Sequence, residues 1–164
     1  MAGQYYVLSD SSLFRWSRRL AWLASIVTLA SFLLLPWWPD DMLGASHFFG
    51  SRAETLDWLA DHEEPFLEPT VFHHIGIGYV RFGCFIHLAA AIVAPTLVAR
   101  RGWHWLCALL PVTALWQFSY VRSFELINTT GVPYVGVLCG AVFTGCWIAI
   151  RQAIATMAEE RASG

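Results

Sequence analysis

Four apolar runs, each about long enough to cross a lipid bilayer, constrain this chain more than any other feature of its sequence. Residues 20–38, 103–121 and 132–150 contain no Asp, Glu, Lys or Arg, and residues 71–99 contain only Arg81. A helix of 19 residues, the length of three of these runs, extends for about 28 Å, and the hydrocarbon layer of a bilayer is about 30 Å thick. The sequence therefore predicts an all-α polytopic membrane protein with a four-transmembrane-helix bundle.

Composition supports the same prediction. Hydrophobic residues make up 57% of the chain and charged residues 13%, whereas ordinary soluble domains carry about 25% charge. The 164 residues allow one integral membrane domain, residues 1–164. A net charge of −2 gives no reason to expect nucleic acid as a partner. The apolar runs make the lipid bilayer the first partner predicted.

Arginine sets the predicted orientation, because basic residues in short connections stay on the cytoplasmic side. All ten basic residues are Arg, and only Arg52 and Arg122 flank the predicted outer side. Seven flank the other side: Arg15, Arg18, Arg19, Arg100, Arg101, Arg151 and Arg161. We expect a multi-pass protein of the cell inner membrane with both termini cytoplasmic. The first span lacks a small-x-small cleavage signal at its end and is expected to remain as a signal anchor.

The loop between the first two spans, residues 39–70, is strongly acidic, with eight of the twelve acids against one Arg. Ser51 and Glu54 have the spacing of a capping box, and Pro65 would end the helix that follows it. This pattern predicts a short amphipathic helix on the outer surface, with Asp57 and Asp61 on its polar face. The acidic face either serves only to solvate the loop or docks a basic soluble partner.

Three histidines in the second span are the first candidates for cofactor binding. His73 and His87 are 14 residues apart, which leaves them about 40° apart around a helix and about 21 Å apart along it. This spacing resembles that of di-haem b cytochromes and would place haem b at each histidine. Two such haems also need matching histidines on a second helix, and the other histidines, His47, His62 and His104, do not supply them.

A metal site is the second interpretation of the same region. His73 and His74 lie close in sequence to His62 and Glu64, and imidazole and carboxylate groups are suitable ligands for zinc or copper. His74 and His87 are also spaced like the end of the Asp-x3-His-x12-His pattern of membrane copper monooxygenases, with Thr70 at the Asp position. The alternative is a hydrogen-bonded surface cluster without metal.

His87 itself falls near the middle of the predicted bilayer, at a height similar to those of Thr113, Gln117 and Thr144. An ionisable residue at this depth suggests quinone or proton handling. The structural alternative is a neutral imidazole that donates a hydrogen bond to Gln117 on the neighbouring helix.

Small residues on the fourth span suggest close helix packing. Gly136 and Gly140 form a GxxxG motif that Thr144 extends, and Gly145 lies on an adjacent stripe. Either stripe allows close approach, within the bundle or to another membrane subunit. The four cysteines also lie within spans and form no CxxC pair, which favours packing over redox chemistry.

No nucleophile and base pattern or phosphate-binding loop is present, so an enzyme is the less favoured class. The sequence favours a non-catalytic small integral membrane subunit of a larger complex for electron transfer or transport. Other membrane protein subunits would then be its partners. The alternative is a membrane redox protein that binds haem, copper or quinone through histidines of the second span.

Overall fold

The computed structural model describes residues 12–35, 75, 78–100, 102–123 and 131–163, and every regular element in these ranges is helical. The predicted all-α class is thereby confirmed for the described residues, which form four α-helices. Two of them continue from a shorter helical turn. The elements are α2 (Ser12–Leu34), the π-helix η1 (Tyr79–Gly83) leading into α6 (Cys84–Leu97), the 3₁₀-helix η2 (His104–Ala108) leading into α7 (Leu109–Ser123), and α8 (Val132–Ser163).

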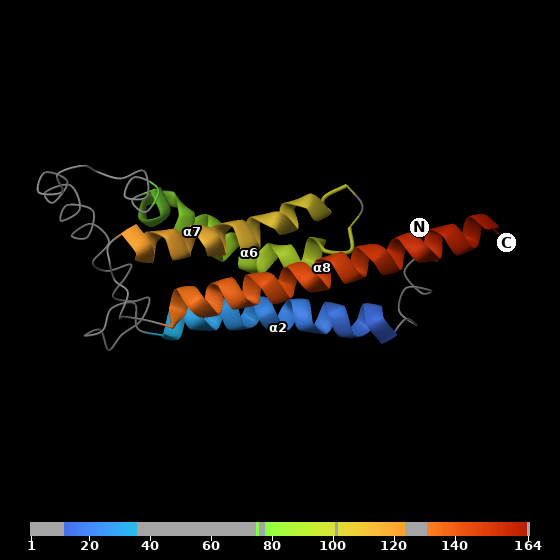
Figure 1. The fold of residues 1–164 in the computed structure, drawn as a ribbon, viewed down its shortest axis with the longest axis horizontal. Coiled ribbons are helices and arrows are strands. Elements are labelled where there is room, and N and C mark those ends of the chain that lie inside the picture. Colours follow the sequence, from blue (N-terminus) through green and yellow to red (C-terminus); the bar gives the residue numbers. More distant parts are fainter. Residues whose placement is uncertain (1–11, 36–74, 76–77, 101, 124–130, 164) are drawn as a thin grey trace, which may run out of the picture.

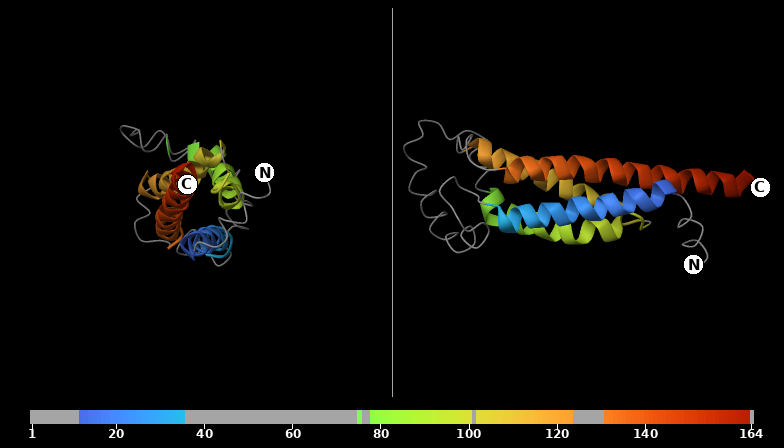
Figure 2. Two further views of the ribbon diagram at one scale, coloured as in Figure 1. Left: turned by 90° about the vertical axis from the view of Figure 1, so that its right-hand side faces the viewer. Right: turned by 90° about the horizontal axis from the view of Figure 1, so that it is seen from below.

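The four helices form an elongated antiparallel bundle (Figure 1). Helix α2 packs against α8 and α6, and α7 packs against the same two helices, so the four close into a ring. Successive helices run in opposite directions, and the start of α2 and the end of α8 lie at the same end of the bundle (Figures 1 and 2). The last part of α8 extends beyond the other three helices.

Small and polar side chains fill much of the bundle interior. The buried positions of α2 recur every three or four residues, as expected for one face of a helix: Phe14, Ser17, Ala21, Ala24, Ser25, Thr28, Ser31 and Phe32. Helix α6 buries Ala90, Ala91 and Ala94, and the Cys107 thiol donates a hydrogen bond to the Ala94 carbonyl at 3.3 Å. Bulky aromatic and aliphatic residues therefore occupy only part of the core.

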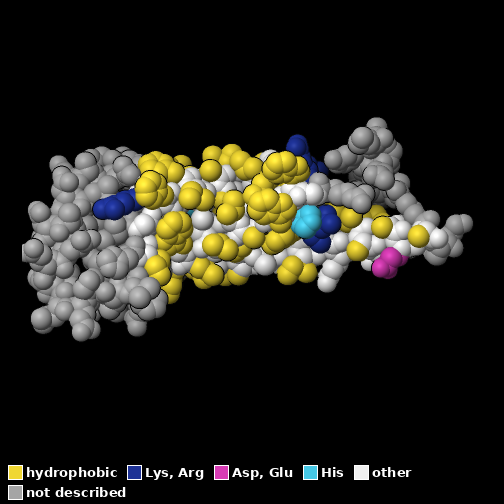
Figure 3. Space-filling model, turned by 90° about the horizontal axis from the view of Figure 1, so that it is seen from above, with side chains coloured by type: hydrophobic (Ala, Val, Ile, Leu, Met, Phe, Trp, Pro, Cys, Tyr) yellow, Lys and Arg dark blue, Asp and Glu magenta, His cyan; other side chains and the backbone are white. Residues whose placement is uncertain are grey.

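Large apolar side chains cover the outside of the helices instead. On α2 alone Trp16, Leu23 and Ile26 are each more than half exposed, and Leu138 on α8 is 65% exposed. In the space-filling view, apolar side chains cover the middle of the bundle and basic side chains lie toward its two ends (Figure 3). Large apolar side chains therefore lie on the outside of the bundle as well as in its core, whereas the outer face of a water-soluble helix is polar.

A tight connection joins α6 to η2. The Val98 amide donates to the Ala94 carbonyl at 3.1 Å and the Arg100 amide to the Leu97 carbonyl at 2.9 Å, which ends α6. Gly102 then takes φ +88°, a value that side chains with a Cβ rarely adopt. Glycine at this position allows the chain to reverse into the next helix.

Two of the helices, Ser12–Leu34 and Val132–Glu159, are long and apolar enough to cross a membrane, while the apolar helix Arg81–Leu97 is shorter. Both long helices extend beyond the predicted spans, because α2 begins before residue 20 and α8 continues past residue 150. The predicted spans end where charged residues begin. Arg, Ala, Gln and Glu are good helix formers, so α2 and α8 continue through the charged residues. The acidic segment 39–70, with its predicted amphipathic helix, lies outside the described residues.

Candidate functional site

A buried hydrogen bond between α6 and α7 marks the most polar point of the bundle interior. His87 on α6 and Thr113 on α7 are 1% and 2% exposed, and His87 Nδ1 lies 2.8 Å from Thr113 Oγ1. The predicted contact of His87 with α7 is thus present. The predicted partner was wrong, because His87 is hydrogen-bonded to Thr113 and neither amide atom of Gln117 has a hydrogen-bond partner among the described residues.

The surroundings of Thr113 determine which nitrogen of His87 carries the proton. Thr113 Oγ1 lies 2.7 Å from the Leu109 carbonyl oxygen and 3.1 Å from that of Leu110. Two oxygens at 2.7 Å repel each other unless a proton lies between them, so the hydroxyl donates back to α7. Thr113 Oγ1 then accepts from His87, and Nδ1 is the protonated nitrogen.

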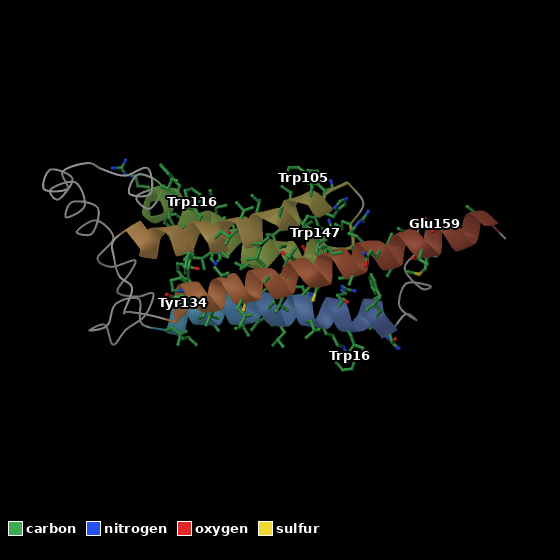
Figure 4. All side chains as sticks on the ribbon, viewed as in Figure 1. Trp16, Trp105, Trp116, Tyr134, Trp147 and Glu159 are labelled. Atoms are coloured by element: carbon green, nitrogen blue, oxygen red, sulfur yellow. The ribbon has the colours of Figure 1, made fainter. Side chains whose placement is uncertain are left out.

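His87 Nε2 consequently holds a lone pair on the opposite edge of the ring. A buried imidazole without an acidic neighbour is neutral, because an unpaired charge in the interior is costly. Glu159, the one acid whose side chain the structure describes, lies near the far end of α8 (Figure 4). Nε2 is buried, and no described residue donates a hydrogen bond to it.

Gln117 follows Thr113 by one turn of α7 and is also 1% exposed. Neither its amide oxygen nor its amide nitrogen has a hydrogen-bond partner among the described residues. Gly136 of α8 lies directly against it, since a Cβ built at Gly136 would be 2.6 Å from Gln117 Oε1. Any larger residue at position 136 would collide with the Gln117 amide in this position.

Aromatic rings surround these polar groups. The ring centroids of Phe32 on α2 and Tyr79 on η1 lie 6.2 Å and 6.5 Å from that of His87, and Tyr79 packs edge-on against Trp116 at 6.1 Å. The Trp116 indole donates a hydrogen bond to the Ile75 carbonyl at 2.7 Å. All four helices thus contribute to one assembly, called here the His87 cluster: Phe32, Tyr79, His87, Thr113, Trp116, Gln117 and Gly136.

The π-helical turn η1 helps to orient Tyr79. Tyr79 and His87 are eight residues apart, which in a regular α-helix would separate them by about 80°. In η1 the Cys84 amide donates to the Tyr79 carbonyl, five residues back, and this wider turn reduces the separation. Gly83 completes the arrangement, because a Cβ there would lie 2.7 Å from the Tyr79 ring and 3.0 Å from that of Trp116.

The predicted interface residues of α8 have two different environments. Gly140 faces α7, and a Cβ there would lie 3.2 Å from Pro111 Cα. The Thr144 hydroxyl donates to the Gly140 carbonyl at 2.8 Å. Gly145 is exposed, with nothing within 4 Å of a built Cβ. The Gly136 and Gly140 stripe therefore packs inside the bundle, and the Gly145 stripe faces outward.

The predicted metal ligands and outer-face residues lie outside the described residues, and their roles stay predictions. They are His62, Glu64, His73, His74, Asp57 and Asp61. Within the described ranges no group of three or more His, Cys, Asp or Glu side chains is close enough to hold a metal. The four cysteines, Cys84, Cys107, Cys139 and Cys146, are buried free thiols.

No family model, curated protein or solved structure matches this chain. The chemistry of the site therefore has to be argued from the His87 cluster itself. It offers one lone-pair acceptor at His87, one amide at Gln117 and the buried hydroxyls of Tyr79 and Thr113, and no Asp, Glu or Cys belongs to it. Such a set can bind a polar group but supplies no evident catalytic step.

Sequence reasoning identified His87, Thr113 and Gln117 as polar residues at similar heights, and it missed Tyr79 and Gly83. Tyr79 lies two residues before Arg81, the single charged residue of the predicted second span, so nothing local marked it as buried. The role of Gly83 depends on Trp116, which is distant in sequence. Neither residue carried a signal that a single sequence could reveal.

Proposed function

We propose that this protein is a four-span integral membrane protein of the cell inner membrane, with both termini cytoplasmic, and a non-catalytic small subunit of a larger membrane complex for electron transfer or transport. The observation that supports a membrane location best is the exposure of large apolar side chains along the bundle. The interior face of α2 consists of Ala, Ser and Thr together with Phe14 and Phe32, while Trp and Leu cover its outside. Exposing so many large apolar groups to water would be unfavourable, whereas in lipid it is neutral.

The two shorter helices also fit a bilayer once their flanking turns are included. The helical segment from Tyr79 to Leu97 extends for about 28 Å and that from His104 to Ser123 for at least about 30 Å. Both lengths match a hydrocarbon layer of about 30 Å. We therefore propose that α6 and α7 cross the bilayer beside α2 and α8.

Aromatic side chains near the bundle ends support the same placement. Trp16 and Trp105 lie toward one end and Tyr134 toward the other, and all three are more than half exposed (Figure 4). The Arg19 guanidinium lies over the Trp16 ring, with its carbon Cζ 5.3 Å from the ring centroid. Exposed Trp and Tyr in two bands are typical of membrane interfaces, and Arg beside them fits the headgroup layer.

Cysteine labelling tests the proposed topology. In a background without the four native cysteines, Ser163→Cys at the end of α8 should react with an impermeant maleimide only after the cells are opened. Ser46→Cys, in the acidic outer segment, should react in intact cells. Labelling of Ser163→Cys from outside intact cells would contradict the orientation.

The subunit role is supported by surfaces that the bundle leaves free. The outward stripe of α8 includes Ala141 and Gly145, both exposed, so another helix could approach this side closely. The acidic segment 39–70 would present a second surface to a basic partner. Replacing Gly145 by Leu should reduce recovery of membrane partners from solubilised membranes, and Ala89→Leu, at an exposed small residue of α6, is the control.

The acidic surface is tested separately, by neutralising Asp57, Asp61 and Glu64 together as Asn, Asn and Gln. Exposed charges are screened over about 8 Å at physiological ionic strength, so a basic partner should be lost and its wild-type binding should weaken with salt. Recovery of the same partners in wild-type amounts from this variant and from Gly145→Leu would contradict the subunit role.

A membrane redox role is the second candidate, favoured by one observation. His87 Nε2 is a buried nitrogen with a free lone pair, the atom through which histidine binds haem iron or copper. A visible absorption spectrum with metal analysis of the purified protein tests it. A Soret band or bound copper that disappears in His87→Gln would support this role, and a colourless, metal-free protein would contradict it for haem and copper.

A further inference from the structure

We propose that the His87 cluster binds a hydroxyl group, carried by a ligand that donates its O–H to His87 Nε2 and is held by the Gln117 amide. Three observations lead to this inference: the proton position on His87, the two polar side chains that lack partners, and the apolar surroundings. It does not depend on whether the protein is a subunit of a larger complex.

The proton position selects the chemistry of the ligand. Because Thr113 donates to the Leu109 carbonyl, His87 Nδ1 must donate to Thr113, and Nε2 can only accept. A ligand that forms a hydrogen bond with Nε2 must therefore bring a donor. A quinone carbonyl cannot serve, since it only accepts, whereas the hydroxyl of a hydroquinone or of water can donate.

The two unpartnered side chains indicate where the hydroxyl is held. His87 Nε2 and both amide atoms of Gln117 are buried and have no partner among the described residues, although buried polar groups in proteins are nearly always hydrogen-bonded. Thr113 and Gln117 are one helical turn apart and therefore lie on the same side of α7, the side on which Thr113 Oγ1 accepts from His87 Nδ1. The amide can accept a second hydroxyl proton or donate to the ligand oxygen.

The surroundings favour a small neutral ligand. Phe32 and Tyr79 present rings to His87, and Gly136 lies against the amide. His87 is the one titratable His, Asp or Glu in the His87 cluster, which disfavours a charged ligand or a metal ion that needs several donors. The hydroxyl can come from two sources, a water molecule or the head group of a membrane-soluble hydroquinone.

Nitrogen-15 NMR of the wild-type protein tests the proposal, with labelled histidine in phosphatidylcholine vesicles. The His87 signals are assigned as those lost in His87→Gln. We expect a protonated Nδ1 and an unprotonated Nε2 that accepts a hydrogen bond. If Nε2 is already hydrogen-bonded in plain vesicles and receives magnetisation from water, the ligand is water.

If Nε2 is free in plain vesicles, a decyl hydroquinone should shift its signal, and the dimethyl ether of the same compound should not. That result identifies a hydroquinone head group as the ligand. Gln117→Leu should then weaken hydroquinone binding by about tenfold, as expected for one lost hydrogen bond, whereas Gln152→Leu on the exposed face of α8 should not.

Four results would overturn the proposal. The first two are a proton on Nε2 and a metal bound to Nε2. The third is a hydrogen bond to Nε2 in plain vesicles without transfer of magnetisation from water. The fourth is an Nε2 that stays free when the hydroquinone is added, or that responds equally to its dimethyl ether. Each is read from the wild-type spectrum, and the His87→Gln variant serves only to assign its signals. A failure here leaves the membrane topology and the subunit role untouched, because those are measured by labelling and by partner recovery.

Discussion

Substituting Ala for Gly140 should destabilise the bundle, and the same change at Gly145 measures how much of that effect comes from helix packing. A Cβ at Gly140 would lie 3.2 Å from Pro111 Cα and 3.4 Å from Ala114 Cβ, whereas at Gly145 nothing lies within 4 Å. Pro111 Cα belongs to the backbone, so it cannot rotate away, and α7 must shift. Overpacking of this kind costs about 1–3 kcal/mol.

The two variants share every other effect of the substitution. Each removes a glycine from the interior of α8, which favours the helix by about 1 kcal/mol. The propensity gain cancels in the comparison, so Gly140→Ala should be less stable than Gly145→Ala by about 1–3 kcal/mol. This difference corresponds to about 5- to 150-fold in the unfolding equilibrium constant.

Unfolding in mixed micelles with increasing SDS, followed by far-UV circular dichroism, measures both free energies. The wild-type chain provides the reference, and Gly145→Ala should be at least as stable as the wild type. Equal free energies of unfolding for the two variants would refute the close packing of α8 on α7. A Gly145→Ala variant that is the less stable of the two would refute it more strongly.

Two further changes test the His87 cluster. Thr113→Val removes the acceptor of the His87 Nδ1 proton while keeping the side-chain shape, so the same unfolding assay should show a loss of about 1–3 kcal/mol. Thr96→Val, at an exposed site on α6, should change stability by less than about 0.5 kcal/mol, and an equal loss in both variants would contradict a buried hydrogen bond. Gly83→Ala would place a methyl group 2.7 Å from the nearest aromatic ring and should alter the near-UV dichroism, whereas Gly131→Ala, with open space around it, should not. Identical near-UV spectra for the two glycine variants would contradict the aromatic packing around η1.

The long apolar runs predicted the helices correctly, because the apolar character of a helix is local to its own residues. The ends of α2 and α8 were predicted less well, since a run without charges marks the hydrocarbon and not the helix. Arg15 and Arg151 are exposed or partly exposed at positions where the helix simply continues. The sequence contains no signal that ends a helix at either residue.

The candidate site could be predicted only in part. The contact of His87 with α7 could be predicted from helix geometry. Its partner could not, because Thr113 and Gln117 are one turn apart and only the rotation of α7 decides between them. The π-helical turn at Tyr79 packs against Trp116, which is distant in sequence, and it leaves no pattern in the sequence.

The most direct test of the membrane proposal concerns α6 and α7, since only α2 and α8 are long and apolar enough by themselves to cross a bilayer. Nitroxide labels at the outward positions Phe85, Ile92, Val112 and Leu115, each 48–59% exposed, report their surroundings by electron paramagnetic resonance in vesicles. We expect collisions with oxygen to exceed those with a water-soluble nickel chelate at all four positions, and the reverse at Glu159. If the chelate reaches α6 and α7 as readily as Glu159, these two helices do not lie in lipid and the four-span bundle is wrong.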